Sequence, residues 1–128
     1  MPPASALLSR EVVSINRATG EGIVSYKARP EFTNRHGTVQ GGFLSAMLDS
    51  ATALTLIGCL GPEETAVTRS LAVEFLRPAK IGAFLARTKI TAHSGVNAEV
   101  TGDLIDEAGV TVATAVAALR VVKRRPSP

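Results

Sequence analysis

The stretch from Asn34 to Gly58 contains the residues of this chain that are best suited to chemistry. Gly41 and Gly42 stand where a helical pattern begins, and without side chains they let backbone N–H groups meet a ligand carbonyl or anion directly. Asp49 is the only acid or base in the apolar run that follows. A carboxylate in so apolar a run must be paired, neutralised or used. The stretch therefore joins a candidate carbonyl- or anion-binding loop to one candidate acid–base group.

One long helix must position these groups. From Gly42 to Gly58 the apolar residues recur with a helical period, and Asp49 points away from the main apolar face. The helix is apolar over most of its circumference, which predicts that it is largely buried. The predicted core face comprises Leu44, Met47, Ala51 and Leu54, and the side of Asp49 comprises Gly42, Ser45, Ala46, Thr52, Ala53 and Leu56.

The rest of the chain is predicted to be extended. The later segments are rich in β-branched residues, which suit a pleated surface, and turn residues separate them. The last segment contains enough alanine to be read as a helix, but its alternation favours a strand. The predicted fold class is therefore α+β, with five to six mostly antiparallel strands curled around one long central helix. The predicted strands are residues 11–16, 22–28, 66–76, 83–92, 98–105 and 110–122.

Length and charge limit the possible classes of function. A chain of 128 residues with 45% hydrophobic content fits one compact domain. We expect a flexible N-terminal lead at 1–9, a single domain at 10–122 and a basic tail at 123–128. That tail supplies most of the net charge of +3, and the chain has no Trp and one Tyr for stacking on bases. No nucleic-acid partner is therefore expected.

Targeting and metal signals are weak. Cys59 is the only cysteine, so no intrachain disulfide is possible, and the thiol is interpreted as a small buried hydrophobe. The first residues make a poor signal peptide, and the apolar run that carries Asp49 is unlike a membrane span. We therefore expect a cytoplasmic protein without a membrane partner. His93 has no second His or Cys at metal spacing, so no metal is predicted.

Two motifs identify a family resemblance. The pattern N-x-x-G-T-x-x-G-G from Asn34 to Gly42, followed by Asp49 eight residues after Gly41, resembles the PaaI-like acyl-CoA thioesterases of the hotdog superfamily. Val67-Thr68 and the block from Val73 to Gly82 look like the strand and turn that lead from the active site to the CoA groove in these enzymes. The resemblance spans roughly residues 20–120. It implies the hotdog fold and hydrolysis of an acyl-CoA to a carboxylic acid and CoA, without a cofactor.

The resemblance also implies a role for each motif residue. The Gly41 N–H would polarise the thioester carbonyl, and Asp49 would be either a general base or a nucleophile that forms a transient anhydride. Thr68 falls where the family often places a Ser or Thr that holds the attacking water, and Asn34 where an Asn contacts the carboxylate or the substrate. Because the loop of one subunit and the acid of its partner form one site in the family, a homodimer, or a tetramer built as a dimer of dimers, is implied.

Four further residues are candidates for substrate binding. Arg77 and Lys80 would grip CoA phosphates, with a solvated rim as the alternative. Gly42 is the second glycine of the pair. His36 is a candidate in the loop, with an ordinary loop or interface histidine as the alternative.

Gln40 departs from the family pattern, which has His before the two glycines. Glutamine can donate a hydrogen bond but cannot titrate. If the family His only orients the thioester, Gln40 would replace it as a catalytic residue; if the proton of the His is needed, activity should be low or the substrate scope altered. A non-catalytic acyl-CoA-binding module, a sensor or a store, is therefore the main alternative function. A hotdog dehydratase or hydratase is a weaker one, because the helix contains no His. At the residue scale, Asp49 as a structural acid paired with an arginine (Arg69 or Arg77) and Thr68 as a simple strand residue also remain open.

Overall fold

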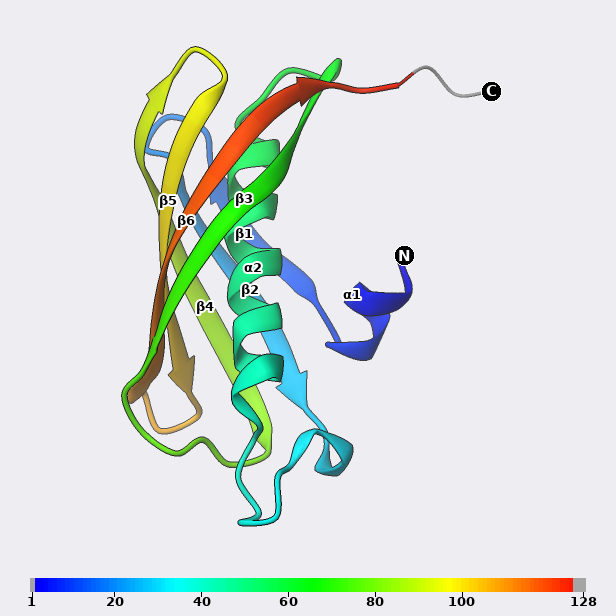
Figure 1. Cartoon of the computed structure of the whole chain (residues 1–128), viewed down its shortest axis with the longest axis vertical. Helices are drawn as coiled ribbons and strands as arrows, with labels where there is room; N and C mark the ends of the chain where they lie inside the picture. Colours follow the sequence, from blue (N-terminus) through cyan, green and yellow to red (C-terminus); the bar gives the residue numbers. More distant parts are fainter. Residues whose placement is uncertain (1, 126–128) are drawn as a thin grey trace.

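The alternating segments form a six-stranded antiparallel sheet in the computed structural model, which describes residues 2–125 (Figure 1). The strand order is β1-β2-β4-β5-β6-β3, so β1 and β3 are the edges. The strands are β1 (Glu11–Asn16), β2 (Glu21–Ala28), β3 (Glu64–Phe75), β4 (Gly82–Ser94), β5 (Asn97–Asp106) and β6 (Thr111–Lys123). The helices are α1 (Pro3–Leu7), the short 3-10 helix η1 (Pro30–Phe32) and α2 (Gly41–Gly58).

The long helix α2 lies in the curve of the sheet and contacts β2 to β6 (Figure 1). This confirms the predicted α+β fold class, a curled sheet around one central helix. The helix begins one residue earlier than predicted, a difference of the size usual at helix ends. By length and hydropathy α2 also passes a test for membrane spans, but this is weak support for a span because the core helices of soluble proteins pass it too.

The buried face of α2 is wider than predicted. Thr52 and Leu56, which we expected on the side of Asp49, are fully buried, whereas Leu54 is only half-buried. The prediction was wrong there because the sheet curls around more of the helix than one stripe. Burial of Thr52 is tolerated because its hydroxyl donates to the Leu48 carbonyl at 2.8 Å. The buried residues of α2 are Leu44, Met47, Leu48, Ala51, Thr52, Thr55 and Leu56.

The edge strand β3 contains a β-bulge. Thr68 pairs with Leu119 and Ser70 pairs with Ala118 on β6, so Arg69 is an extra residue without a partner. Because side chains alternate along a strand, one extra residue shifts the alternation by one. Thr68 before the bulge and Leu71 and Val73 after it therefore all face α2.

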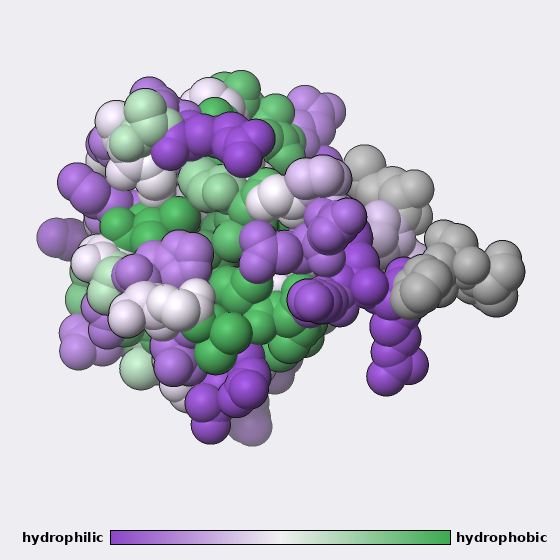
Figure 2. All heavy atoms as spheres, turned by 90° about the horizontal axis from the view of Figure 1, so that it is seen from above, coloured by the Kyte–Doolittle hydropathy of each residue, from purple (hydrophilic) through white to green (hydrophobic). Residues whose placement is uncertain are grey.

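Both chain ends differ from the expected lead and tail. Residues 3–7 form α1, Leu8 is buried, and its carbonyl accepts a hydrogen bond from Lys27 N at 3.0 Å. Lys123 pairs with Glu64 as the last residue of β6, because β3 is long enough to offer it a partner. Figure 2 looks down on this end of the molecule and shows hydrophilic and apolar side chains interleaved. Residues 126–128 of the predicted tail lie outside the described residues.

Candidate active site

Asp49 and Thr68 meet where α2 faces the edge strand β3. The Thr68 hydroxyl donates a hydrogen bond to Asp49 Oδ1 at 2.7 Å, and both side chains are half-buried. Within residues 2–125 the Asp49 carboxylate accepts this hydrogen bond alone, and it forms no ion pair with Arg69 or Arg77. Oδ2 is therefore available to water or a substrate. A carboxylate held in this way can take a proton from water or attack a carbonyl carbon.

The start of α2 presents backbone N–H groups. Gln40 is the N-cap residue with an extended backbone (φ −62°, ψ 137°), and Gly41 is the first residue of the helix. Across the described chain no side chain caps this end, and the first turn contains no acid. The first N–H groups of a helix lack partners within the helix, and the helix dipole makes this end positive. The Gly41 N–H can therefore serve as a donor to a carbonyl oxygen that gains negative charge.

The loop before α2 is fixed from two sides. Val39 N donates to the Ala79 carbonyl at 2.7 Å, and Gln40 N donates to the Phe32 carbonyl at 2.8 Å. The Phe32 ring stacks on the Phe43 ring, with centroids 4.1 Å apart. These contacts tie the glycine pair to both η1 and the turn after β3. The Gln40 side chain is exposed.

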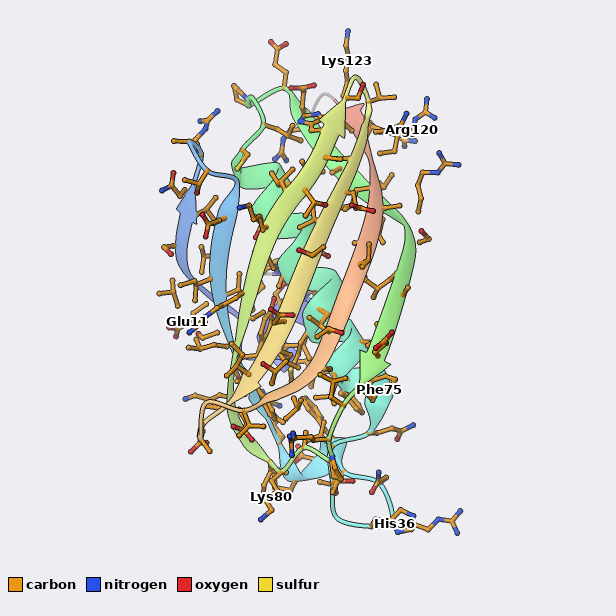
Figure 3. All side chains as sticks on the ribbon, turned by 90° about the vertical axis from the view of Figure 1, so that its left-hand side faces the viewer. Glu11, His36, Phe75, Lys80, Arg120 and Lys123 are labelled. Carbon is orange, nitrogen blue, oxygen red and sulfur yellow. The ribbon has the colours of Figure 1, made fainter. Side chains whose placement is uncertain are left out.

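Asn34 holds the loop together in the single chain. Its Oδ1 accepts hydrogen bonds from the backbone N–H groups of His36 at 2.9 Å and Thr38 at 3.3 Å, and its Nδ2 donates to Thr38 Oγ1 at 3.1 Å. The amide is thus already engaged away from Asp49, and its contact with the carboxylate or the substrate stays a prediction. His36 is exposed at the loop tip (Figure 3).

The two parts of the predicted site are separate within one chain. Gly41 and Asp49 are eight residues apart on the same straight helix, which amounts to roughly 12 Å along its axis. One thioester carbonyl cannot contact both. Each chain therefore contains two half-sites, a donor half at Gly41 and an acid half at Asp49.

A groove adjoins the donor half. It has a volume of about 390 Å³, and its wall includes Val39, Gly41, Leu44, Phe75 and Arg77. Of the two predicted phosphate-binding residues, Arg77 lines this groove, whereas Lys80 is exposed in the turn beyond it. Figure 3 places Lys80 and His36 at the same end of the molecule, and Lys123 at the opposite end. Gly42 is exposed beside Gly41.

Two aromatic residues near the half-sites were missed from the sequence. Phe75 packs its ring against Gly41, and Tyr26 on β2 donates its hydroxyl to Ser50 Oγ at 2.9 Å, one residue from Asp49. Burial raises the pKa of Tyr26 to about 12. Phe75 lies inside the motif block that ends at Gly82, so its place next to the predicted site was a usable signal. Nothing in the local sequence distinguishes Tyr26 from an ordinary strand residue.

Comparison with known proteins agrees with this geometry. The family model described as Thioesterase superfamily matches residues 36–113. The phenylacetic acid degradation-related protein of Ralstonia eutropha JMP134 superposes with a TM-score of 0.91 at 32% identity, over 94% of this chain and 90% of that one. The E. coli PaaI protein superposes with a TM-score of 0.85 at 19% identity, over 94% of this chain and 85% of that one, which supports the fold alone.

Human acyl-coenzyme A thioesterase 13 is 28% identical over 83 residues. The match includes 65% of this chain, and the chain spans only 56% of the length of that relative. The family model covers more than half of the chain, and the Ralstonia protein is similar over nearly its whole length. The chain therefore belongs to the thioesterase superfamily.

Proposed function

We propose that this protein is an acyl-CoA thioesterase that converts R–CO–S–CoA and water into R–COOH and CoA. The observation that carries the proposal is the hydrogen bond from Thr68 to Asp49 Oδ1, in a chain of this superfamily. It places a carboxylate with a free oxygen beside a hydroxyl that can orient water. The human relative named above is an acyl-coenzyme A thioesterase, which supports a CoA thioester as the substrate.

The chemistry follows from the two half-sites. In the general-base route, Asp49 takes a proton from water while the water oxygen attacks the thioester carbon. The Gly41 N–H stabilises the negative charge that develops on the carbonyl oxygen. The carbon–sulfur bond then breaks, and the proton passes from Asp49 to the departing thiolate. In the nucleophilic route Asp49 attacks the carbon itself and displaces the CoA thiolate, which forms a mixed anhydride. Water then hydrolyses the anhydride to R–COOH and the Asp49 carboxylate, and the proton released goes to the CoA thiolate.

A second copy of the chain completes the site in this proposal. The separation of roughly 12 Å between Gly41 and Asp49 in one chain requires the donor half and the acid half to come from different subunits. A two-fold arrangement would bring each Gly41 to the partner's acid half and form two equal sites. The edge strand β3, which contains Thr68, is the natural neighbour of such a partner because its outer backbone groups are unpaired in the chain.

The CoA part of the substrate would lie toward the turn after β3. Arg77 lines the groove beside Gly41, and Lys80 is exposed three residues later. Cationic side chains in and beyond this groove suit the phosphates of CoA. The acyl group would then extend toward the acid half of the partner.

The decisive experiment measures thiol release from aryl, short, medium and long acyl-CoAs by the wild type, Asp49→Ala and Asp49→Asn. Each variant should lose about 100-fold or more in kcat, because it lacks the base or nucleophile. Their circular dichroism should be unchanged. Wild-type rates in both variants would remove Asp49 from the mechanism.

The same panel separates the hydrolase from the non-catalytic module. Gln40 has an exposed side chain that makes no capping bond to α2, which is the observation that favours a binder without turnover. Calorimetry with each acyl-CoA supplies the second readout. Tight binding without thiol release in the wild type would replace the thioesterase by a sensor or store.

A further inference from the structure

Phe75 ends the edge strand β3 with an unusual placement for a large aromatic residue. Its side chain is 54% exposed, yet its ring points back toward the start of α2 (Figure 3). Phe75 belongs to neither cluster of core residues found within residues 2–125. Its contact with Gly41 is therefore the one to explain.

The Phe75 ring accounts for glycine at position 41. A Cβ atom at Gly41 would lie 3.0 Å from Phe75 Cζ and 3.1 Å from Cε1, closer than nearly all real Cβ contacts. At Gly42, by contrast, nothing in the described chain lies within 4 Å of such an atom. Glycine at position 41 and glycine at position 42 therefore have different structural explanations. The ring occupies the side-chain position of Gly41, whereas the side of Gly42 is open.

The ring contacts the peptide that joins the loop to α2. The N–H groups of Val39 and Gln40 are bound to the carbonyls of Ala79 and Phe32. The next peptide, with the Gly41 N–H, joins that loop to α2, and its carbonyl, Gln40 O, accepts a hydrogen bond from Phe43 N at 2.9 Å. On the other side of its N–H, glycine allows wide backbone freedom. The three nearest atoms to the side-chain position of Gly41 all belong to the Phe75 ring. The ring therefore limits the motion of this peptide.

We propose that Phe75 is a positioning residue that fixes the orientation of the Gly41 amide. The proposal rests on the proposed function, in which that amide polarises the thioester carbonyl. A donor that is already oriented needs no reorganisation when charge develops on the oxygen. A mobile donor loses part of this advantage, and the loss appears in kcat rather than in substrate binding.

The first test compares kcat and KM of Phe75→Ala and Phe75→Tyr with the wild type. Phe75→Ala should lower kcat by roughly 10-fold to 100-fold and change KM by less than about threefold, because the donor is misplaced rather than removed. Phe75→Tyr keeps the ring and should stay within about twofold of the wild type. Leu85→Ala, an exposed apolar residue on β4, is the matched control and should leave both constants unchanged. An unchanged kcat in Phe75→Ala, or a loss in KM alone, would overturn the proposal.

A second test does not depend on activity. In ¹⁵N NMR relaxation, the order parameter of the Gly41 amide should fall from the rigid range near 0.85 toward about 0.6 in Phe75→Ala, and stay high in Phe75→Tyr. Gly41→Ala should lower the thermal midpoint in the wild-type background but not in the Phe75→Ala background. Absence of both effects contradicts the positioning role even if the wild type hydrolyses thioesters. Absence of thiol release in the wild type contradicts the proposed function, and the NMR result then decides the role of Phe75 alone.

Discussion

At the residue scale, hydroxyl groups decide how polar side chains are accommodated around α2. Thr68 binds the Asp49 carboxylate, and the Tyr26 hydroxyl donates to Ser50 on the flank toward β2. Tyr26 is buried, so ionising it would place a negative charge in a poorly solvated position near the carboxylate of Asp49. The neutral phenol is therefore an integral part of the folded state.

This predicts a stability change that is confined to alkaline pH. The pKa of Tyr26 is raised from 10.0 to about 12 because burial disfavours the phenolate. A raised pKa stabilises the fold fully below pH 10, and this stabilisation, about 2–3 kcal/mol by linkage, is lost as pH rises toward 12. Tyr26 is the only tyrosine and the chain has no Trp, so phenolate absorbance reports this group alone.

The measurement is an absorbance titration of native and urea-unfolded protein, with urea midpoints of the wild type and Tyr26→Phe at several pH values. The pH midpoint of phenolate formation should be well above the midpoint of the unfolded protein when the protein is native. Tyr26→Phe should be less stable than the wild type near neutral pH, because it lacks the bond to Ser50, and its stability should fall less above pH 10. Coincident titration of the native and unfolded protein would contradict the burial argument.

Residue types and spacing predicted the acid half of the site but not the full donor half. Asp49 stood out as the lone charge in an apolar run, and the family resemblance gave Thr68 as the residue that holds the attacking water. The reason for Gly41 could not be read in the same way, because the Phe75 ring comes from a strand more than thirty positions further along the chain. Threonine burial in α2 was missed for a similar reason. A hydroxyl that is satisfied inside the helix does not look apolar in the sequence.

At the scale of elements, the bulge in β3 determines which side chains reach α2. If Arg69 were an ordinary paired residue of a regular strand, Thr68 and Leu71 would lie on opposite faces, so either Thr68 or the side chains of Leu71 and Val73 would have to turn away from the helix. Full burial of one such apolar side chain is worth about 1.5–3 kcal/mol, whereas a typical hydrogen bond contributes about 1 kcal/mol. Leu71 and Val73 should therefore keep facing α2 when a change in β3 allows only one of the two, their burial or the hydrogen bond of Thr68.

Deletion of Arg69 and Ser70 together is thus expected to keep the fold and lose the site, because Thr68 would then directly precede Leu71 and face the opposite way, whereas deletion of Arg69 alone leaves Thr68 opposite Leu119. The segment before the deletion would shift by one residue, so that Val67 faces α2 in place of Thr68. Thiol release should fall at least as far as in Thr68→Ala, while the thermal midpoint stays within a few degrees, and Arg69→Ala should retain activity because it keeps the bulge. Full activity in the deletion variant would show that Thr68 is not needed beside Asp49.

The strand limits were predictable from alternation and turn residues, but the bulge was not. Thr68 and Leu71 stand on opposite faces of an ideal strand, and the two polar residues between them, Arg69 and Ser70, show no clear change of phase. Only the pairing with β6 reveals that Arg69 has no partner.

At the scale of the whole molecule, the proposed enzyme is a pair of chains that exchange half-sites. Gly41→Pro and Gly41→Ala distinguish loss of the N–H donor from crowding by an added side chain. Proline suits the first helical position and the extended backbone of Gln40 but removes the N–H, whereas alanine adds a Cβ and keeps the N–H. Loss of one such donor typically lowers kcat about 100-fold or more.

Mixing two inactive variants should therefore restore activity. Half of the dimers formed at random from Asp49→Ala and Gly41→Pro are mixed, and each mixed dimer has one intact site of two, so about a quarter of the wild-type activity is expected. The measurement is thiol release after co-refolding, with each variant refolded alone and a mixture of Asp49→Ala with Gly41→Ala for comparison. No recovery would mean that both halves act within one chain or that the chains do not exchange.

The place of β3 in the sheet also determines when the site can form during synthesis of the chain. Asp49 and Thr68 lie close together in the chain, but β3 is held in the sheet only by β6, the last strand of the described fold. Thr68 therefore has no fixed position until β6 has emerged from the ribosome. A nascent or truncated product without β6 would carry the acid and the hydroxyl but not their alignment, so incomplete chains are expected to be inactive by construction.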